Sequence, residues 1–392
     1  VTQRLLPSEV VALSPKDLKA IVVESLGQGS HAALLTREKG IPTLAGFSGL
    51  LSQIHSGDEV LVDVFRERLI VSPEPETRRD FEQRLENYRA SLLTCKWKCY
   101  RPAITRDGQK ISVEANLAAH TSVDTVIENG ADGVGLVRIE ELYFARDLPP
   151  SEGDLLSELQ HLVAPLREKP VTIRLLDIGG DKAIPSLRLP FESNPLLGKR
   201  GVRLLLDYPQ LARTQLKSLL RLSQAQDIRI LVPMVTLERD MQQMRELLVE
   251  VAHEVGIQKL PPLGAMIETP AAALTVGQIA RHADFLSVGT NDLTQYTLVA
   301  GRDDSTVSDY YQDTHPSMLR LLSIIIAEAS GKPVTLCGEM AGREEAIPTL
   351  LELGFRALSI SPPLIPTTKE LIRTIDTRNP HARGEHESSK VF

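Results

Sequence analysis

The sequence predicts an α/β fold: a (β/α)8 barrel preceded by a smaller β/α domain and a helical linker. Short apolar runs alternate with helical stretches through most of the chain after residue 106. These runs are rich in Val, Ile and Leu, which is typical of parallel strands buried on both faces. Eight strand–helix units within about 270 residues match the usual size of a (β/α)8 barrel, so we favour it over a doubly wound open sheet.

The eight predicted strands follow one another at regular intervals, with predicted helices such as 237–255 and 343–353 between them. The strands are Ile111–Ala115, Val134–Val137, Val171–Leu176, Ile228–Val232, Leu263–Ile267, Phe285–Val288, Val334–Leu336 and Ala357–Ile360.

Residues 1–75 have a different pattern, with apolar runs at 20–23 and 60–62 that predict strands. A helical stretch begins at His31, and Gly40 is a typical residue for ending it. Residues 76–105 are dense in charge and predict a linker helix. The barrel then occupies 106–378, and the polar segment 379–392 forms a tail. Because the chain starts at Val1 rather than Met, we expect the first domain to be incomplete at its N-terminus.

Composition excludes several classes of protein. The 392 residues include 44 Lys and Arg against 51 Asp and Glu, and a net charge of −7 gives no support for a nucleic-acid partner. No apolar run approaches the roughly 20 residues of a membrane span. Three cysteines cannot form a disulfide framework, so we expect a protein of the reducing cytoplasm. Because no apolar run is long enough, we expect no membrane insertion.

Polar residues follow the predicted barrel strands, at the end where chemistry occurs in this fold. They include Arg138, Arg174, Glu268, Asn291, Asp292 and Cys337. Arginine binds phosphate or carboxylate oxygens in a bidentate manner, and carboxylates together with a substrate phosphate hold Mg2+. Any one of these residues alone is better explained as a surface ion pair, a helix cap (Asp292) or a small buried side chain (Cys337). Their convergence on one face predicts an anionic ligand bound with a divalent cation.

His31 lies at a predicted helix N-terminus behind the segment Gly27-Gln28-Gly29-Ser30. Unpaired backbone N–H groups at such a position suit a phosphoryl group. A lone histidine near a helix cap is more often a solvent-exposed residue.

Several sequence blocks together resemble Enzyme I of the phosphoenolpyruvate:sugar phosphotransferase system, over about residues 5 to 375. The blocks are Gly-Ser-His-Ala-Ala at 29–33, Gly133–Arg138, Arg174–Lys182, Asn194–Arg203, Met266–Ala273, Gly289–Tyr296 and Leu336–Gly342. Their order and spacing are those of the family.

The resemblance implies a role for each matching residue. His31 matches the histidine that takes the phosphoryl group, and Cys337 matches the acid that protonates the enolate to give pyruvate. Arg138, Arg174 and Arg302 match arginines that bind substrate, and Asn291 an amide that contacts its phosphate. Glu268 and Asp292 match the ligands of Mg2+. The family transfers the phosphoryl group onward to the carrier protein HPr and forms a homodimer through the barrel.

Two alternatives stay open. A dikinase of the pyruvate phosphate dikinase or phosphoenolpyruvate synthase kind shares the same arrangement of domains. A non-catalytic regulatory paralogue is supported by three departures from the family pattern: Gly29, Ile139 and Thr269.

Overall fold

The computed structural model describes residues 1–14, 18–26, 31–118, 123–144, 148–179, 187, 192–302 and 304–378. The chain forms two compact units, one made mainly of residues 1–98 and the other mainly of residues 99–383. Gly29 and the predicted tail 379–392 lie outside the described residues. Among the described residues, no helix has the length and apolar character needed to cross a membrane.

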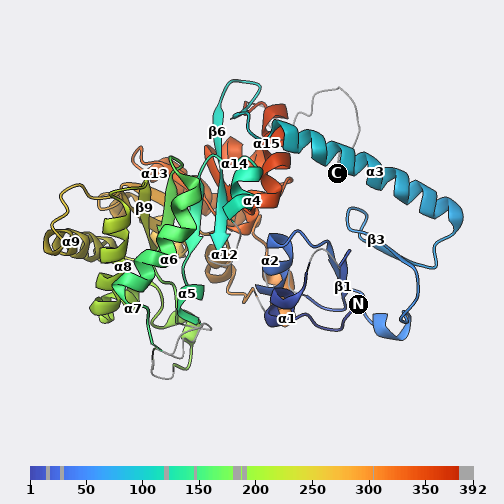
Figure 1. Ribbon diagram of the computed structural model, residues 1–392, viewed down its shortest axis with the longest axis horizontal. Coiled ribbons are helices and arrows are strands. Elements are labelled where there is room, and N and C mark those ends of the chain that lie inside the picture. The colour runs from blue at the N-terminus through green and yellow to red at the C-terminus, as the bar shows by residue number, and fades with distance from the viewer. Residues whose placement is uncertain are drawn as a thin grey trace. The chain divides into compact units, whose positions relative to one another are not determined.

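The first unit contains two small sheets. Strands β1 (Ile21–Val23) and β2 (Thr43–Ala45) are parallel, and β3 (Val60–Asp63) and β4 (Arg68–Val71) form an antiparallel hairpin. Helix α2 (His31–Glu38) connects β1 to β2. The other elements of this unit are α1 (Pro7–Ala12), the short helix η1 (Leu50–Ser52) and the long helix α3 (Pro75–Lys98), which is drawn in Figure 1.

Helix α3 is attached to the β3–β4 hairpin by polar and aromatic contacts. The Arg84 side chain donates a 2.6 Å hydrogen bond to the buried carboxylate of Asp63 on β3. The rings of Phe65 and Tyr88 meet edge to face, with their centroids 4.9 Å apart.

Gly40 follows the end of α2 and has φ of +65°. Glycine is favoured there because it adopts this left-handed backbone conformation without steric cost.

The second unit is a closed parallel barrel, which confirms the predicted fold. Its eight strands pair in chain order, and the last pairs with the first to close the sheet. The strands are β6 (Lys110–Ala118), β7 (Val134–Arg138), β8 (Val171–Arg174), β9 (Ile228–Val235), β10 (Leu263–Ile267), β11 (Phe285–Val288), β12 (Val334–Leu336) and β13 (Ala357–Ile360). A short strand, β5 (Ala103–Ile104), lies antiparallel to β6.

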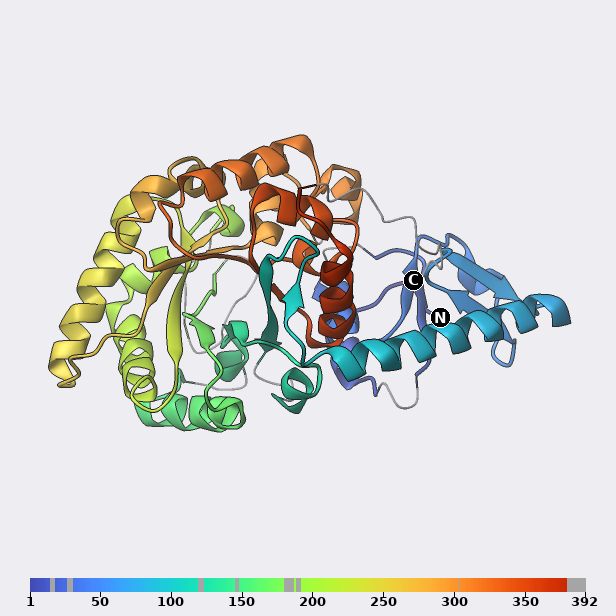
Figure 2. The same ribbon diagram turned by 90° about the horizontal axis from the view of Figure 1, so that it is seen from above.

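Helices cover the outside of the barrel, as Figures 1 and 2 show. They are α4 (Val123–Glu128), α5 (Glu141–Phe144), α6 (Glu152–Val163), α7 (Val202–Asp207), α8 (Pro209–Leu222), α9 (Glu238–Glu254), α10 (Pro270–Leu274), α11 (Val276–Ile279), α12 (Thr290–Leu298), α13 (Pro316–Glu328), α14 (Ile347–Leu353) and α15 (Ile365–Thr374). Short 3-10 turns in this unit occupy 164–166, 195–197, 339–342 and 362–364, and another at 305–310 groups with the first unit.

The barrel has two apolar layers. The large outer core lies between strands and helices, and each fully buried Leu, Ile or Val in it contributes about 1.5–3 kcal/mol. A smaller cluster inside the barrel contains Leu136, Leu231, Met266, Phe285 and Cys337. Gly264 makes room for this inner cluster, because a Cβ atom there would lie 2.4 Å from the Phe285 ring.

Candidate active site at the carboxyl ends of the barrel strands

The carboxyl ends of the strands carry the polar residues that the sequence singled out. Arg138 and Arg174 are the last residues of β7 and β8. Glu268 directly follows β10, Asn291 and Asp292 lie in the first turn of α12, and Cys337 directly follows β12. Arg174, Glu268, Asp292 and Cys337 are all buried. Parallel strands bring these residues to one end of the barrel although up to 200 residues separate them.

Arg174 is held by two carboxylates. Its guanidinium donates to Glu140 at 2.7 Å and lies 3.2 Å from Asp177. The same Glu140 oxygen accepts the backbone N–H of Asp177 at 3.2 Å, which ties the ends of β7 and β8 together. The Nε of Arg174 is buried and has no hydrogen-bond partner among the described residues. A buried donor of this kind is one that an anionic ligand could satisfy.

Arg200 bridges two carboxylates that come from distant parts of the chain. Its Nε and one terminal nitrogen donate to the two oxygens of Asp177, both at 3.0 Å. Its terminal nitrogens also donate to the two oxygens of Asp292, at 2.8 and 3.1 Å. Tyr296 adds a contact at 3.2 Å. Asp292 therefore pairs with Arg200 and is more than a helix cap.

Arg200 is a site residue that the sequence analysis did not identify. It lies in one of the sequence blocks that resemble the family, but no chemical role was assigned to it. Its partners are 23 and 92 residues away, so no local pattern reveals the bridge. The available signal was the need of Asp177 and Asp292, which both follow barrel strands, for a buried counter-charge.

Glu268 is almost fully buried, and the carboxylates of Asp292 and Asp177 act on it electrostatically. One of its oxygens accepts the backbone N–H of Met234 at 2.6 Å. Met234 has φ of +56°, an uncommon conformation for a residue with a side chain, at the end of β9. Burial, together with the neighbouring Asp292 and Asp177, raises the pKa of Glu268 to about 8, although Arg174 and Arg200 act in the opposite direction.

The charges at this end of the barrel leave an excess of negative charge. Glu140, Asp177, Glu268 and Asp292 are buried, with only Arg174 and Arg200 as buried arginines beside them. If all are ionised, negative charges exceed positive ones by two. A divalent cation would balance that excess, so the residues fit a bound Mg2+. In the part of the chain that the structure describes, no three His, Cys, Asp or Glu side chains form a ready-made metal cage. Mg2+ commonly takes only one or two carboxylates, with water and substrate oxygens completing its coordination.

Cys337 is a buried thiol with two polar neighbours. The Ser287 hydroxyl donates to its sulfur at 3.2 Å, and the thiol donates to the Val288 carbonyl at 3.4 Å. Burial raises its pKa to about 11, so the thiol keeps its proton near neutral pH. Nearby, the side-chain oxygen of Asn291 accepts the backbone N–H of Glu339 at 2.9 Å.

Three departures from the family pattern were noted in the sequence, and the structure accounts for one of them. Thr269 is the N-cap of α10: its hydroxyl accepts from the Ala272 N–H at 3.2 Å and donates to the Val235 carbonyl at 3.3 Å. Ile139 is a buried core residue.

Two of the predicted site residues belong to the other compact unit. His31 is the first residue of α2, but its side chain and the preceding residues 27–30 are outside the part of the chain that the structure describes. Arg302 lies in the segment 298–312, which groups with the first unit. Their roles stay predictions from the family resemblance.

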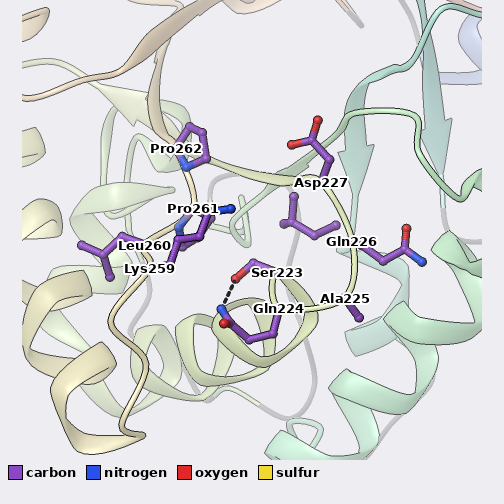
Figure 3. A pocket seen from close by; sticks show the side chains of 10 residues that line it. Ser223, Gln224, Ala225, Gln226, Asp227, Lys259, Leu260, Pro261 and Pro262 are labelled. Carbon is purple, nitrogen blue, oxygen red and sulfur yellow. Dashed lines mark hydrogen bonds between the residues drawn. The ribbon is translucent and has the colours of Figure 1, made fainter.

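A pocket occurs at the opposite end of the barrel, where β9 and β10 begin. It measures about 340 Å3 and is lined by residues 223–228 and 259–262 (Figure 3). Asp227 and Lys259 are the charged residues in its lining. Active sites of this fold lie at the carboxyl ends of the strands, so this pocket is not the candidate active site.

Comparison with known sequences agrees with the geometry. Residues 95–377 match the family described as "PEP-utilising enzyme, PEP-binding domain", and residues 1–67 match "PEP-utilising enzyme, mobile domain". A phosphoenolpyruvate-protein phosphotransferase from Geobacillus stearothermophilus is 36% identical over 368 residues, which cover 92% of this chain and 64% of the relative. The chain belongs to the phosphoenolpyruvate-protein phosphotransferase family.

Other members of this family are similar to the same degree. The phosphoenolpyruvate-protein phosphotransferase of Bacillus subtilis is 36% identical, with 92% of this chain and 65% of that protein covered. The one from Priestia megaterium is 36% identical, with 96% and 67% covered. The chain thus spans about two thirds of the length of these relatives.

Proposed function

We propose that the chain carries the phosphoenolpyruvate-binding and phosphoryl-accepting parts of a phosphoenolpyruvate–protein phosphotransferase. The observation that carries this proposal is the buried network of two arginines and four carboxylates at the carboxyl ends of the barrel strands, in a chain of this family. The curated relatives named above are phosphotransferases, so they give the dikinase alternative no support.

The substrate carries a phosphate and a carboxylate, and the proposal assigns its anionic groups to Arg138, Arg174 and Arg302. The unsatisfied Nε of Arg174 supports this assignment, since a phosphate oxygen would complete its hydrogen bonding. Asn291 would contact the phosphate through its side-chain amide.

The chemical step is transfer of the phosphoryl group to His31. A ring nitrogen of His31 attacks phosphorus, the bond between phosphorus and the enol oxygen breaks, and the electron pair of that bond forms an enolate. The thiol of Cys337 then gives its proton to the methylene carbon, which yields pyruvate and leaves a thiolate. Its raised pKa supports a role as an acid, because the proton is present at neutral pH.

Glu268 and Asp292 would hold Mg2+. When bound, the ion would neutralise negative charge on the substrate oxygens, which is the main requirement in phosphoryl transfer. The excess of two negative charges that the buried side chains carry when all four carboxylates are ionised supports this assignment.

The proposal includes the setting of the reaction. HPr, or a carrier like it, would take the phosphoryl group from His31, and the protein would act in the cytoplasm as a homodimer formed through the barrel. Light scattering on the chain with substrate and Mg2+ would test the dimer.

The decisive experiment is intact-mass analysis after incubation with phosphoenolpyruvate and Mg2+. We expect one acid-labile phosphate on the parent chain, none on His31→Ala, and release of pyruvate. A His31→Ala protein that still gains the phosphate would refute the acceptor assignment. Binding of phosphoenolpyruvate without phosphorylation of the parent would favour the regulatory paralogue.

A further inference from the structure

The sulfur of Cys337 has a fixed hydroxyl neighbour on the adjacent strand. Ser287 lies on β11 and Cys337 directly follows β12, two parallel strands in which Ser287 pairs with Thr335 and Val288 with Leu336. The Ser287 hydroxyl donates to the Cys337 sulfur at 3.2 Å. Ser287 is 1% and Cys337 5% exposed, so water does not compete freely for this bond.

Burial and one carboxylate disfavour a negative charge on the sulfur, and two arginines favour one. Cys337 belongs to the inner apolar cluster of the barrel, together with Leu136, Leu231, Met266 and Phe285. The charged groups that act on it are Glu268 from β10, which disfavours a thiolate, and Arg174 and Arg138 from β8 and β7, which favour one. The Val288 carbonyl accepts a hydrogen bond from the thiol, but it cannot donate one to a thiolate.

Proton transfer changes the hydrogen bonding of the sulfur, because a thiolate accepts hydrogen bonds and no longer donates one. When the S–H bond breaks and the new C–H bond forms, the electron pair stays on sulfur as a thiolate. A hydroxyl that donates to an ionised acceptor makes a bond roughly twice as strong as one between neutral groups. The Ser287 hydrogen bond therefore strengthens as the proton leaves, whereas the contact to Val288 is lost.

We propose that Ser287 is a positioning residue for Cys337: it holds the sulfur at the carboxyl end of the barrel and stabilises the thiolate left by proton transfer. This inference rests on the proposed function, because it needs Cys337 to be the acid. It adds a residue that neither the sequence blocks nor the charges identify.

The test compares the thiolate reactivity of Cys337 in Ser287→Ala and in the parent chain. The probe is methyl methanethiosulfonate at fixed pH, with modification of each cysteine resolved by peptide mass spectrometry. A hydrogen bond to a charged group is worth enough for the Ala variant to react about 10- to 100-fold more slowly at Cys337. Single-turnover pyruvate formation should slow by a similar factor, with little change in phosphoenolpyruvate affinity.

Matched variants separate this effect from a loss of packing. Ser218→Ala removes another buried serine, whose hydroxyl bonds to the carbonyls of Glu152 and Thr214 far from the sulfur, and should react like the parent. Ser287→Thr keeps a hydroxyl and should restore the rate. Ser287→Gly gives a second hydroxyl-free protein if the Ala variant does not fold.

Equal modification of Cys337 in the parent and the hydroxyl-free variants, including no reaction in either, would overturn the proposal. The modification assay needs no substrate, so it decides on Ser287 even if the chain fails to bind phosphoenolpyruvate. That second failure would count against the proposed function alone.

Discussion

Arg200 pairs with two buried carboxylates at the active-site end of the barrel. It joins Asp177 to Asp292 through four hydrogen bonds, and all three residues are buried. A buried ion pair gains little over an apolar replacement, but removing one partner leaves an uncompensated charge. Arg200 therefore matters to stability because its partners cannot be solvated.

We predict that Arg200→Met lowers the free energy of unfolding by about 3–5 kcal/mol, since the buried carboxylates of Asp292 and Asp177 both lose the Arg200 guanidinium, although Arg174 still lies 3.2 Å from Asp177. Urea denaturation at neutral pH measures this. The control is Arg213→Met, whose carboxylate partners Glu250 and Glu254 are exposed, and about 0–1 kcal/mol is expected there. Equal losses in the two variants would show that Arg200 is not a special ion-pair bridge.

Glu114 on β6 predicts a pH-dependent stability. It is buried inside the barrel, where the Ser112 hydroxyl donates to it at 3.2 Å, and burial raises its pKa above 4.5. The folded protein therefore favours the protonated form, and ionisation of Glu114 costs stability as pH rises above its ordinary pKa. The cost is complete once pH exceeds the raised folded value.

Replacement by Gln removes that cost, so Glu114→Gln should gain stability relative to the parent as pH rises from 4 toward neutrality. Thermal unfolding across this range measures the difference, with the exposed Glu246→Gln as the surface control. A difference that stays constant with pH, or that favours the parent at higher pH, would contradict the account.

At the scale of elements, β10 and β11 fit together through a glycine. Gly264 lies beside the Phe285 ring, and an added Cβ would approach the ring to 2.4 Å. We predict that Gly264→Ala costs about 1–3 kcal/mol by overpacking the inside of the barrel. Phe285→Leu in the same chain should recover part of the loss. Calorimetric melting of the two single variants and the double variant measures this coupling; additive losses would mean that the ring is not the obstacle.

The sequence predicted the elements of the barrel well because their signal is local. The strands from Leu263 to Ile267 and from Phe285 to Val288 have the predicted bounds, since Val, Ile and Leu runs mark strands buried on both faces. The ends of some strands were predicted less well. Strand β9 continues beyond the predicted Val232 to Val235, and β8 ends at Arg174 instead of the predicted Leu176.

Contacts between strands could not be predicted in the same way. The pairing of Ser287 with Cys337 crosses 50 residues, and the Arg200–Asp292 pairing crosses 92. The positive φ of Met234, which points its N–H at Glu268, has no marker in the sequence because the residue is not glycine. The candidate residues could be named from strand ends and family resemblance, but their partners required the structure.

At the scale of the whole molecule, the parallel order of the barrel strands is what assembles the charge cluster. Arg174 ends β8, Glu268 and Asp292 follow β10 and β11, and the pairing of β13 with β6 closes the barrel that holds them. With all four carboxylates ionised, negative charges there exceed positive ones by two, and the proposed function pairs a cation with an anionic substrate at this end of the barrel.

The most direct test of the account is therefore calorimetric titration of the chain with phosphoenolpyruvate, with and without Mg2+. Parent chain and Glu114→Gln, a buried glutamate outside the cluster, should bind phosphoenolpyruvate much more tightly when Mg2+ is present. Glu268→Gln keeps the shape of the side chain and should lose that Mg2+-dependent gain while staying folded by circular dichroism. Phosphoenolpyruvate binding that is equally strong with and without Mg2+, or unchanged in Glu268→Gln, would contradict the assignment of this end of the barrel as the Mg2+–phosphoenolpyruvate site.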